Sequence, residues 1–355
     1  MEVLENLKTI AWAPEKITLE SLPCPICGGR DIAMMRRARN LHLEPALFTN
    51  KGYKPYPMHA DETSIARCHD CGLVQTNPRR KSTDLIGLNN ALHLVKDYKD
   101  GKVDSGEILT GEGDRALRED RIARVMKFKR SGKWLDVGCG AGRDLDLAVE
   151  KGFEGYGVEL SDVKKDFYKN KKFTVHVGSF ENTPFPPNSF DVISMWDVLE
   201  HVEEPNHVLA KVGALLKPEG LFVAKVPNHA SLYRRLHGVW WDMYHPLHLY
   251  YFTRDTMGKL LSKHGLDILH AETINPYGLG CLAKDILSWR RAKSNVILSH
   301  SEGSAAALSQ GDKKVTIAKS IFRAMDYLPK RVCLQMMMGN FLIVYARRSA
   351  AMPKI

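Results

Sequence analysis

The stretch from 136 to 142 reads Asp-Val-Gly-Cys-Gly-Ala-Gly and places three glycines, Gly138, Gly140 and Gly142, between an apolar run and a helical pattern. Glycine permits the tight turn that such a crossing needs and lets a ligand approach the backbone. A nicotinamide enzyme would carry its third glycine one position later, where Arg143 stands, and would hold a pyrophosphate there. The carboxylate of Asp136 would repel a pyrophosphate, but it suits a cationic amino acid group.

An acid, Glu159, closes the next apolar run at 155–159, seventeen residues after Gly142. The carboxyl ends of neighbouring parallel strands meet at one edge of a sheet, where such folds bind ligands. A carboxylate that ends a central strand is costly to bury without a partner. The position therefore favours Glu159 as the acceptor of hydrogen bonds from both hydroxyl groups of a ribose.

Two histidines, His245 and His248, stand in an aromatic stretch at 240–252, after the fifth predicted strand. An imidazole titrates near neutral pH, so either histidine could remove the proton of an oxygen acceptor as a general base. The alternative is that both pack within the loop and hydrogen-bond it. We keep His245 and His248 as candidate catalytic residues.

Asp197, Glu200 and His201 follow the fourth predicted strand within one helical turn. Such ligands could hold Mg²⁺ or Zn²⁺ beside a vicinal diol, and Asp197 is also a catalytic candidate. The alternative is that these side chains bind no metal. Trp196, at the end of the same strand, is either an aromatic wall for a cationic cofactor or a plain core residue.

Seven cysteines include two Cys-x-x-Cys pairs, Cys24 with Cys27 and Cys68 with Cys71. Four thiolates are enough to close a tetrahedral structural zinc site that leaves no position for a substrate. Forty residues separate Cys27 from Cys68, so we expect a zinc-ribbon-like module with an inserted loop around 54–57. Zinc would stabilise a module whose own core is small. The alternatives are ordinary buried thiols or a redox pair.

The chain has 355 residues, of which 44% are apolar, enough for two to three domains and at least one sizeable core. We find no apolar run near the roughly 20 residues of a spanning helix and no signal-peptide pattern at 1–14, so we expect a cytoplasmic protein. The net charge of +10 favours anionic partners such as nucleic acid, phosphates or a lipid surface. The basic and apolar pattern at 313–338 indicates either peripheral membrane contact or a helix packed on its own domain.

Short β-type runs alternate with helical patterns from residue 133 onward, which is typical of βαβ units on a parallel sheet. Strands are predicted at 134–137, 155–159, 173–177, 190–196, 221–226, 266–274 and 340–345, and helices near 115–130, 144–150, 208–216 and 253–265. The pattern predicts an α/β fold with a doubly wound, mostly parallel seven-stranded sheet. We expect a four-cysteine module at 1–80, connector and lid helices at 81–131, a cofactor-binding domain at 132–275, a helical insertion at 276–338, and the last strand with a tail at 339–355.

Several motifs, in the same order along the chain, resemble those of the class I S-adenosylmethionine-dependent methyltransferases. They are the stretch 136–142, the tripeptide 159–161, and the stretches 184–202 and 216–220, and the two cysteine pairs resemble a subgroup with a four-cysteine module. The resemblance implies that Asp136 and the glycine turn hold the methionine part of the cofactor, Glu159 the ribose with Leu160 beside it, and Ser179 and Phe180 the adenine. The family often has an acid where Ser179 stands, so we expect backbone groups and packing of Phe180 to recognise the adenine.

The same resemblance extends to the stretch 197–201, which is similar to a metal-binding motif of ubiquinone-pathway O-methyltransferases and small-RNA 2′-O-methyltransferases. We therefore expect methyl transfer to oxygen or carbon of a small-molecule or carbohydrate-type acceptor, either free or linked to a nucleotide or lipid. An alternative is an RNA or protein methyltransferase that uses the zinc module for recruitment, which the net charge favours. A third alternative, a non-enzymatic scaffold, predicts no affinity for the cofactor.

Overall fold

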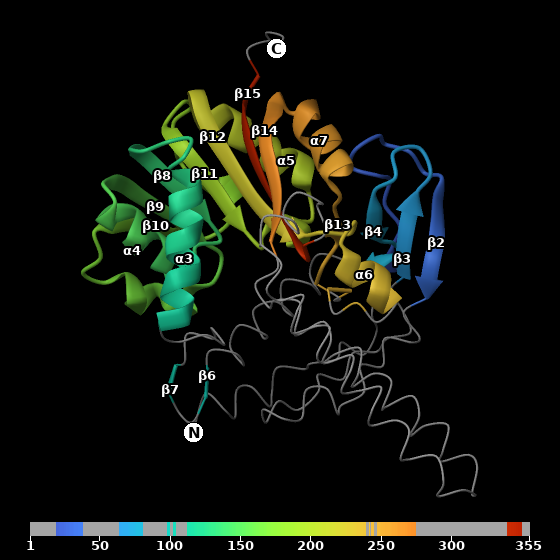
Figure 1. Ribbon diagram of the computed structural model, residues 1–355, viewed down its shortest axis with the longest axis horizontal. Helices are drawn as coiled ribbons and strands as arrows, with labels where there is room; N and C mark the ends of the chain where they lie inside the picture. Colours follow the sequence, from blue (N-terminus) through green and yellow to red (C-terminus); the bar gives the residue numbers. More distant parts are fainter. Residues whose placement is uncertain are drawn as a thin grey trace, which may run out of the picture.

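The structure is a computed structural model of the chain (Figure 1). It describes residues 19–37, 64–80, 98–99, 102–103, 112–238, 241, 243–244, 247–274 and 339–349. Several predicted features lie outside the described residues: the loop at 54–57, the insertion at 276–338 with its basic pattern, most of the connector, and His245. Among the described helices, none is long and apolar enough to cross a membrane.

A seven-stranded sheet forms the centre of the molecule, with the strand order β10-β9-β8-β11-β12-β15-β14. In chain order the strands are β8 (Gly132–Val137), β9 (Phe153–Glu159), β10 (Phe173–Val177), β11 (Phe190–Trp196), β12 (Leu216–Pro227), β14 (Leu266–Ile274) and β15 (Phe341–Arg348). The last strand, β15, pairs antiparallel with both of its neighbours, whereas the pairs from β10 to β12 are parallel. In Figure 1, red β15 lies between yellow β12 and orange β14.

Helices cover both faces of this sheet. They are α3 (Glu112–Val125), α4 (Arg143–Glu150), α5 (Pro205–Leu215) and α7 (Arg254–Lys263). The described chain also forms α6 (Leu232–His237), which lies away from the central sheet, and the short 3-10 helices η4 (Asp162–Tyr168), η5 (Phe180–Asn182) and η6 (Leu199–His201). At the start of α7, the Thr253 side chain accepts a hydrogen bond from the backbone N–H of Thr256, which completes a capping box. Figure 1 shows α3 and α4 on one side of the molecule and α5 and α7 on the other.

The two faces of the sheet are built by alternation along the central strands. Trp134 and Val192 point to the face that carries α3 and α4, where Leu145 of α4 packs against them. Their neighbours Leu135 and Ile193 point to the face that carries α5 and α7. Because successive side chains of a strand point to opposite faces, apolar residues at consecutive positions supply two cores at once.

A second, smaller sheet joins the N-terminal part of the described chain to the segment that follows β12. It has the order β13-β4-β3-β2, with β2 (Ile32–Arg37), β3 (Ser64–Cys68), β4 (Val74–Thr76) and β13 (Tyr250–Tyr251). Two further pairs are β1 (Leu19–Glu20) with β5 (Arg79–Arg80) and β6 (Tyr98–Lys99) with β7 (Lys102–Val103). The edge strand β13 comes from the loop after β12, so the four-cysteine region and the methyltransferase-like region share one sheet.

The predicted strands and helices from 133 to 274 are present; β10, β11 and β14 have the predicted bounds, and the other elements have shifted ends. The helix expected near 115–130 ends at Val125, because the chain turns there and Phe128 stacks on Tyr345 with ring centroids 4.8 Å apart. Leu216, expected to close a helix, begins β12 instead and pairs with Phe190. The side chain of Leu216 is fully buried, and an apolar residue at this position is compatible with either the end of a helix or the start of a strand.

Candidate functional site

The glycine turn after β8 has a backbone shape that favours glycine. Gly138, Gly140 and Gly142 have φ values of 73°, 55° and 74°, in the left-handed region. A Cβ atom at Gly138 would lie 2.6 Å from Val198, and one at Gly142 would lie 2.3 Å from Phe173. The turn therefore brings bare backbone to the carboxyl edge of the sheet, between β8 and α4.

The carboxylate of Glu159, at the end of β9, points toward this turn. Its Oε2 accepts a hydrogen bond from the backbone N–H of Gly140 at 2.9 Å, and its Oε1 accepts one from the N–H of Ser161 at 3.1 Å. Leu160, between them in the chain, exposes its side chain. The structure thus brings together the acid and the glycine turn that the sequence singled out, with an exposed apolar side chain beside them.

Asp136 lies buried at the end of β8, on the face covered by α3 and α4. Its Oδ1 accepts a hydrogen bond from the hydroxyl of Ser194 at 2.6 Å, and the Ser194 oxygen accepts one from the indole N–H of Trp134 at 2.7 Å. Burial raises the pKa of Asp136, and the negative charge of Asp144 raises it further. A bound cation would stabilise the ionised form of this carboxyl group.

Two arginines of α3 offset the charge near Asp136. Arg118 and Arg121 each place a guanidinium nitrogen near Oδ2 of Asp144, at 3.1 Å and 3.2 Å. Arg121 also lies over the ring of Trp196, with 5.3 Å between the guanidinium carbon and the ring centroid. The Trp196 side chain is buried in the core under α3, so Arg121 occupies one face of the ring that was considered as an aromatic wall.

The residues predicted to contact the adenine, Ser179 and Phe180, have one neighbour that the sequence analysis did not single out. The ring of Phe180 is buried in the core, and the ammonium group of Lys211 lies 5.4 Å from its centroid. The hydroxyl of Ser179 donates a hydrogen bond to the carboxylate of Glu181. An acid therefore does stand next to Ser179, two positions later than in the family pattern, and sequence reasoning missed Glu181.

At the carboxyl ends of β11 and β12, Asp197 forms an ion pair with Lys225. The side chain of Lys225 is 7% exposed, and its ammonium group also lies 4.4 Å from the ring centroid of Phe341. Asp197 has a φ of 57°, an unfavourable value for a residue with a side chain. Lys225 was missed by sequence reasoning, although a lysine within the apolar run 221–226 is a signal of a buried charge.

The structure places His248, and not Asp197, with the other two candidate metal ligands. The ligand atoms of Glu200, His201 and His248 all lie within 4.8 Å of one another. Glu200 is 1% exposed, and among the described residues its Oε2 has no hydrogen-bond partner. Burial raises the pKa of Glu200, and the charge of Asp197 adds to the increase. A cation is the partner that would compensate a buried carboxylate of this kind.

Backbone carbonyl groups orient the two imidazole rings of this cluster. Nδ1 of His201 lies 2.9 Å from the carbonyl oxygen of Leu247, and Nδ1 of His248 lies 2.7 Å from that of Met243. Each Nδ1 is therefore assigned as the donor, which places the lone pair on Nε2. The ring centroids of His201 and His248 are 4.7 Å apart. Such carbonyl contacts are typical of histidines that bind metal or accept a proton.

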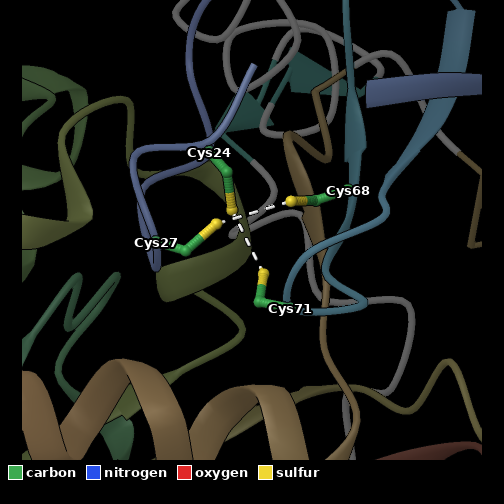
Figure 2. A group of neighbouring side chains, drawn as sticks. All are labelled: Cys24, Cys27, Cys68 and Cys71. Atoms are coloured by element: carbon green, nitrogen blue, oxygen red, sulfur yellow. Dashed lines mark hydrogen bonds between the residues drawn. The ribbon is translucent and has the colours of Figure 1, made fainter. Parts of the chain in front are cut away.

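The four cysteines converge from two separate turns, as Figure 2 shows. The sulfur atoms of Cys24 and Cys71 are 3.4 Å apart, and those of Cys27 and Cys68 are 3.5 Å apart. Zinc–sulfur bonds of about 2.3 Å in a tetrahedron place sulfurs about 3.8 Å apart, close to these distances, whereas a disulfide needs about 2.05 Å. The cluster fits a four-thiolate metal ion. His69 lies within the second turn and pairs with Asp31, so it is not part of the cluster.

Numbered along the chain from β8, the central sheet has the order 3-2-1-4-5-7-6. This order, with a glycine turn after the first strand and an acid at the end of the second, defines the Rossmann-like fold of class I methyltransferases. Residues 111–271 match the family described as Methyltransferase domain. Over these residues the chain is therefore similar to methyltransferase domains.

Relatives of this domain include enzymes with different acceptors in their names. The chain is 32% identical to squalene methyltransferase 1 of Botryococcus braunii over 123 residues, which cover 32% of each protein. It is 29% identical to a ubiquinone biosynthesis O-methyltransferase of Actinobacillus pleuropneumoniae over 123 residues, 32% of this chain and 53% of that one. The chain thus spans about a third to a half of the length of these relatives. A solved methyltransferase structure from Archaeoglobus fulgidus overlaps with a TM-score of 0.43 at 18% identity, over 66% of this chain and 94% of that one.

Proposed function

We propose that this protein transfers the methyl group of S-adenosylmethionine to an oxygen or carbon atom of a small-molecule acceptor. The observation that carries the proposal is the contact between the Glu159 carboxylate and the backbone N–H of Gly140 at 2.9 Å. This contact supports the proposal because Glu159, which we assign to the ribose, then lies beside the bare backbone that a methionine group can approach. The names of the relatives, which include squalene, sterol and ubiquinone enzymes, support a small-molecule acceptor.

Each part of the cofactor then has candidate partners on the carboxyl edge of the sheet. Asp136 and the glycine turn would hold the methionine end, Glu159 the ribose, and Leu160 with the backbone at Ser179 the adenine. The buried ring of Phe180 would support that backbone from below. Bound S-adenosylmethionine supplies an electrophilic methyl group on a positively charged sulfur. The protein must then orient the acceptor in line with that methyl group and exclude water.

The cluster of Glu200, His201 and His248 supplies the acceptor side. For a hydroxyl acceptor, His248 would take the proton at Nε2, because its Nδ1 faces the carbonyl group of Met243 at 2.7 Å. In a second arrangement, a divalent metal held by the three side chains would occupy Nε2 of His248 in place of the proton, and the metal would lower the pKa of a bound hydroxyl group. His245 lies outside the described residues and stays a second candidate base.

The alternative, an RNA or protein methyltransferase, is supported by the net charge of +10. The placement of the cysteine cluster favours the small-molecule proposal. Cys24, Cys68 and Cys71 are buried in the same core as the central sheet, instead of standing apart as a recruiting arm would. Methylation of bulk RNA together with retention on heparin would favour the alternative; a small-molecule acceptor whose turnover is insensitive to salt would exclude it.

Calorimetry with S-adenosylmethionine tests the proposal without knowledge of the acceptor. We expect Glu159→Ala to weaken binding by roughly tenfold or more, since a buried charged hydrogen-bonding partner is worth about 1.5–3 kcal/mol. Glu154→Ala is the matched control, because Glu154 lies on the same strand with an exposed side chain. If the wild-type protein binds no S-adenosylmethionine, the proposal is wrong and the scaffold alternative stands.

A further inference from the structure

The second cysteine turn is also the hairpin that joins β3 to β4. The backbone N–H of Cys68 donates to the carbonyl oxygen of Leu73 at 2.9 Å, and the N–H of Gly72 donates to the carbonyl oxygen of Cys68 at 3.0 Å. Cys68 ends β3 and Cys71 lies in the turn, so both sulfurs of this pair belong to the hairpin. A metal ion on the four cysteines would therefore fix the hairpin to the first turn, which carries Cys24 and Cys27.

The far end of the hairpin holds the loop that carries His248. β4 pairs antiparallel with β13, with Tyr250 opposite Gln75. Immediately beyond this pair, the backbone N–H of Thr76 donates to the carbonyl oxygen of Leu249 at 2.9 Å. The hydroxyl of Thr76 donates to the carbonyl oxygen of His248 at 2.8 Å. One residue of the cysteine region thus holds two consecutive peptide groups at the candidate base.

Side-chain packing couples the same two segments. Ile65 of β3 and Val74 of β4 form one buried cluster with Trp241, Tyr244 and Tyr251 from the loop. None of these contacts involves the glycine turn or Glu159. The hydrogen bonds of Thr76 and the aromatic cluster therefore connect the hairpin to the acceptor side of the site, whereas Cys68, Cys71 and Leu73 of the hairpin lie in the larger core that also contains Val137, Val158 and Phe180.

We infer that Thr76 is a positioning residue for His248, and that the four-cysteine module serves the active site by holding the loop 247–252 in place. The inference rests on the proposed function for the role of His248. In this assignment, a metal ion at the cysteines would fix the position of the hairpin. The hairpin would in turn fix the backbone of residues 248 and 249, and that backbone would hold the imidazole of His248 next to Glu200 and His201.

Three variants of the full-length protein test this assignment. Thr76→Val removes the hydroxyl donor but keeps the branched shape and the backbone N–H. Thr76→Ser keeps the hydroxyl and should restore the wild-type behaviour. Asn206→Leu is the control for docking alone, because the amide of Asn206 binds the carbonyl oxygen of Pro25 at 3.0 Å, in the first cysteine turn and away from His248.

The first measurement is hydrogen exchange of the amides of residues 247–252. We expect exchange about fivefold faster in Thr76→Val, the factor for one lost hydrogen bond, and near wild-type rates in Thr76→Ser and Asn206→Leu. The second is the NMR signal of the His248 imidazole, assigned by its loss in His248→Gln, which should move in Thr76→Val only. Removal of the cysteine-bound metal with a chelator should also speed exchange in 247–252.

The inference is overturned if Thr76→Val leaves both exchange and the His248 signal unchanged, or if Thr76→Ser behaves like Thr76→Val. It is also overturned if metal removal leaves exchange in 247–252 at the metal-loaded rate. S-adenosylmethionine affinity, measured in parallel, should stay within about twofold of wild type in Thr76→Val, because the hydroxyl of Thr76 binds the carbonyl oxygen of His248, away from the glycine turn and Glu159. If the wild-type protein binds no S-adenosylmethionine, the proposed function is wrong. The exchange comparison would still test whether Thr76 holds the loop 247–252.

Discussion

The ammonium group of Lys225 holds the carboxylate of Asp197 at the carboxyl ends of two adjacent parallel strands. Asp197 adopts a left-handed φ of 57° at this position. Because its charge is already paired with Lys225, Asp197 is less suited to bind a metal than the sequence pattern with Glu200 and His201 implies. In the candidate metal site, His248 takes the place predicted for Asp197, and it comes from a loop 47 residues further along the chain than His201.

Metal titration distinguishes the two ligand sets. With the cysteines loaded, we expect Co²⁺ to bind at one further site in the wild-type protein. Glu200→Gln and His248→Gln should each weaken this binding at least tenfold, because each removes one of three ligands. Asp197→Asn should weaken it much less. Absorption spectroscopy of bound Co²⁺ gives the affinity, and equal losses in Asp197→Asn and His248→Gln would restore the ligand set predicted from the sequence.

The pKa of Asp136 predicts how cofactor binding depends on pH. Burial, with the charge of Asp144, raises the pKa of this carboxyl group to about 8, so it is protonated in the unliganded protein at pH 7. A bound cation favours the ionised form, so binding should release a proton, and the affinity for S-adenosylmethionine should rise from pH 6 to pH 8. The increase should be at most about tenfold per pH unit. Calorimetry in two buffers of different ionisation enthalpy measures the proton release, and Asp136→Asn should abolish that contribution.

The cysteine cluster predicts one tightly bound metal ion. Elemental analysis should find about one zinc per chain that is lost in Cys24→Ser. We expect this variant to lose about 4 kcal/mol or more of unfolding free energy, as in other losses of a structural metal. Cys139→Ser is the control. This variant should retain the zinc ion, because Cys139 lies in the glycine turn, away from the four-cysteine cluster. A metal-free wild-type preparation with the same unfolding free energy as the metal-loaded protein would contradict a structural zinc site at these cysteines.

His229 predicts an acid sensitivity of the fold. Burial lowers the pKa of His229 to about 3, with smaller effects from the charges of Arg234 and Arg67. The unfolded chain binds a proton at this histidine below pH 6.5 and the folded chain does not, so stability is lost as pH falls below 6.5. Between pH 7 and pH 5 the cost is about 2 kcal/mol. Urea unfolding at both pH values should show this loss in wild type and a smaller one in His229→Gln.

The sheet could be predicted from the sequence because apolar runs indicate its strands and turn residues mark the ends of those runs. Strands β10 and β11 were predicted to the residue, since buried parallel strands are short apolar runs between turn residues. The glycine turn and Glu159 could be predicted because a left-handed backbone and a strand-terminal acid leave marks in the sequence itself. For the glycine turn and Glu159, only the strand order, which brings the two to the same edge of the sheet, had to come from the structure.

The acceptor side could be predicted only in part, because it depends on contacts between distant segments. No local pattern indicates that Thr76 reaches the carbonyl group of His248, 172 positions away. The pairing of Asp197 with Lys225 likewise requires the register of β11 against β12. The burial of Phe180 follows from packing of η5 on α5. Spacing alone carries none of this information.

The last strand sets a condition on how the protein is made. β15 occupies an interior place in the sheet, yet its residues Phe341–Arg348 leave the ribosome after those of both neighbouring strands, β12 and β14. Until they do, β12 and β14 each present an unpaired edge to other chains in the cell. A nascent chain stalled before residue 341 would therefore be prone to association, and a truncation that removes β15 would disrupt the sheet at its interior.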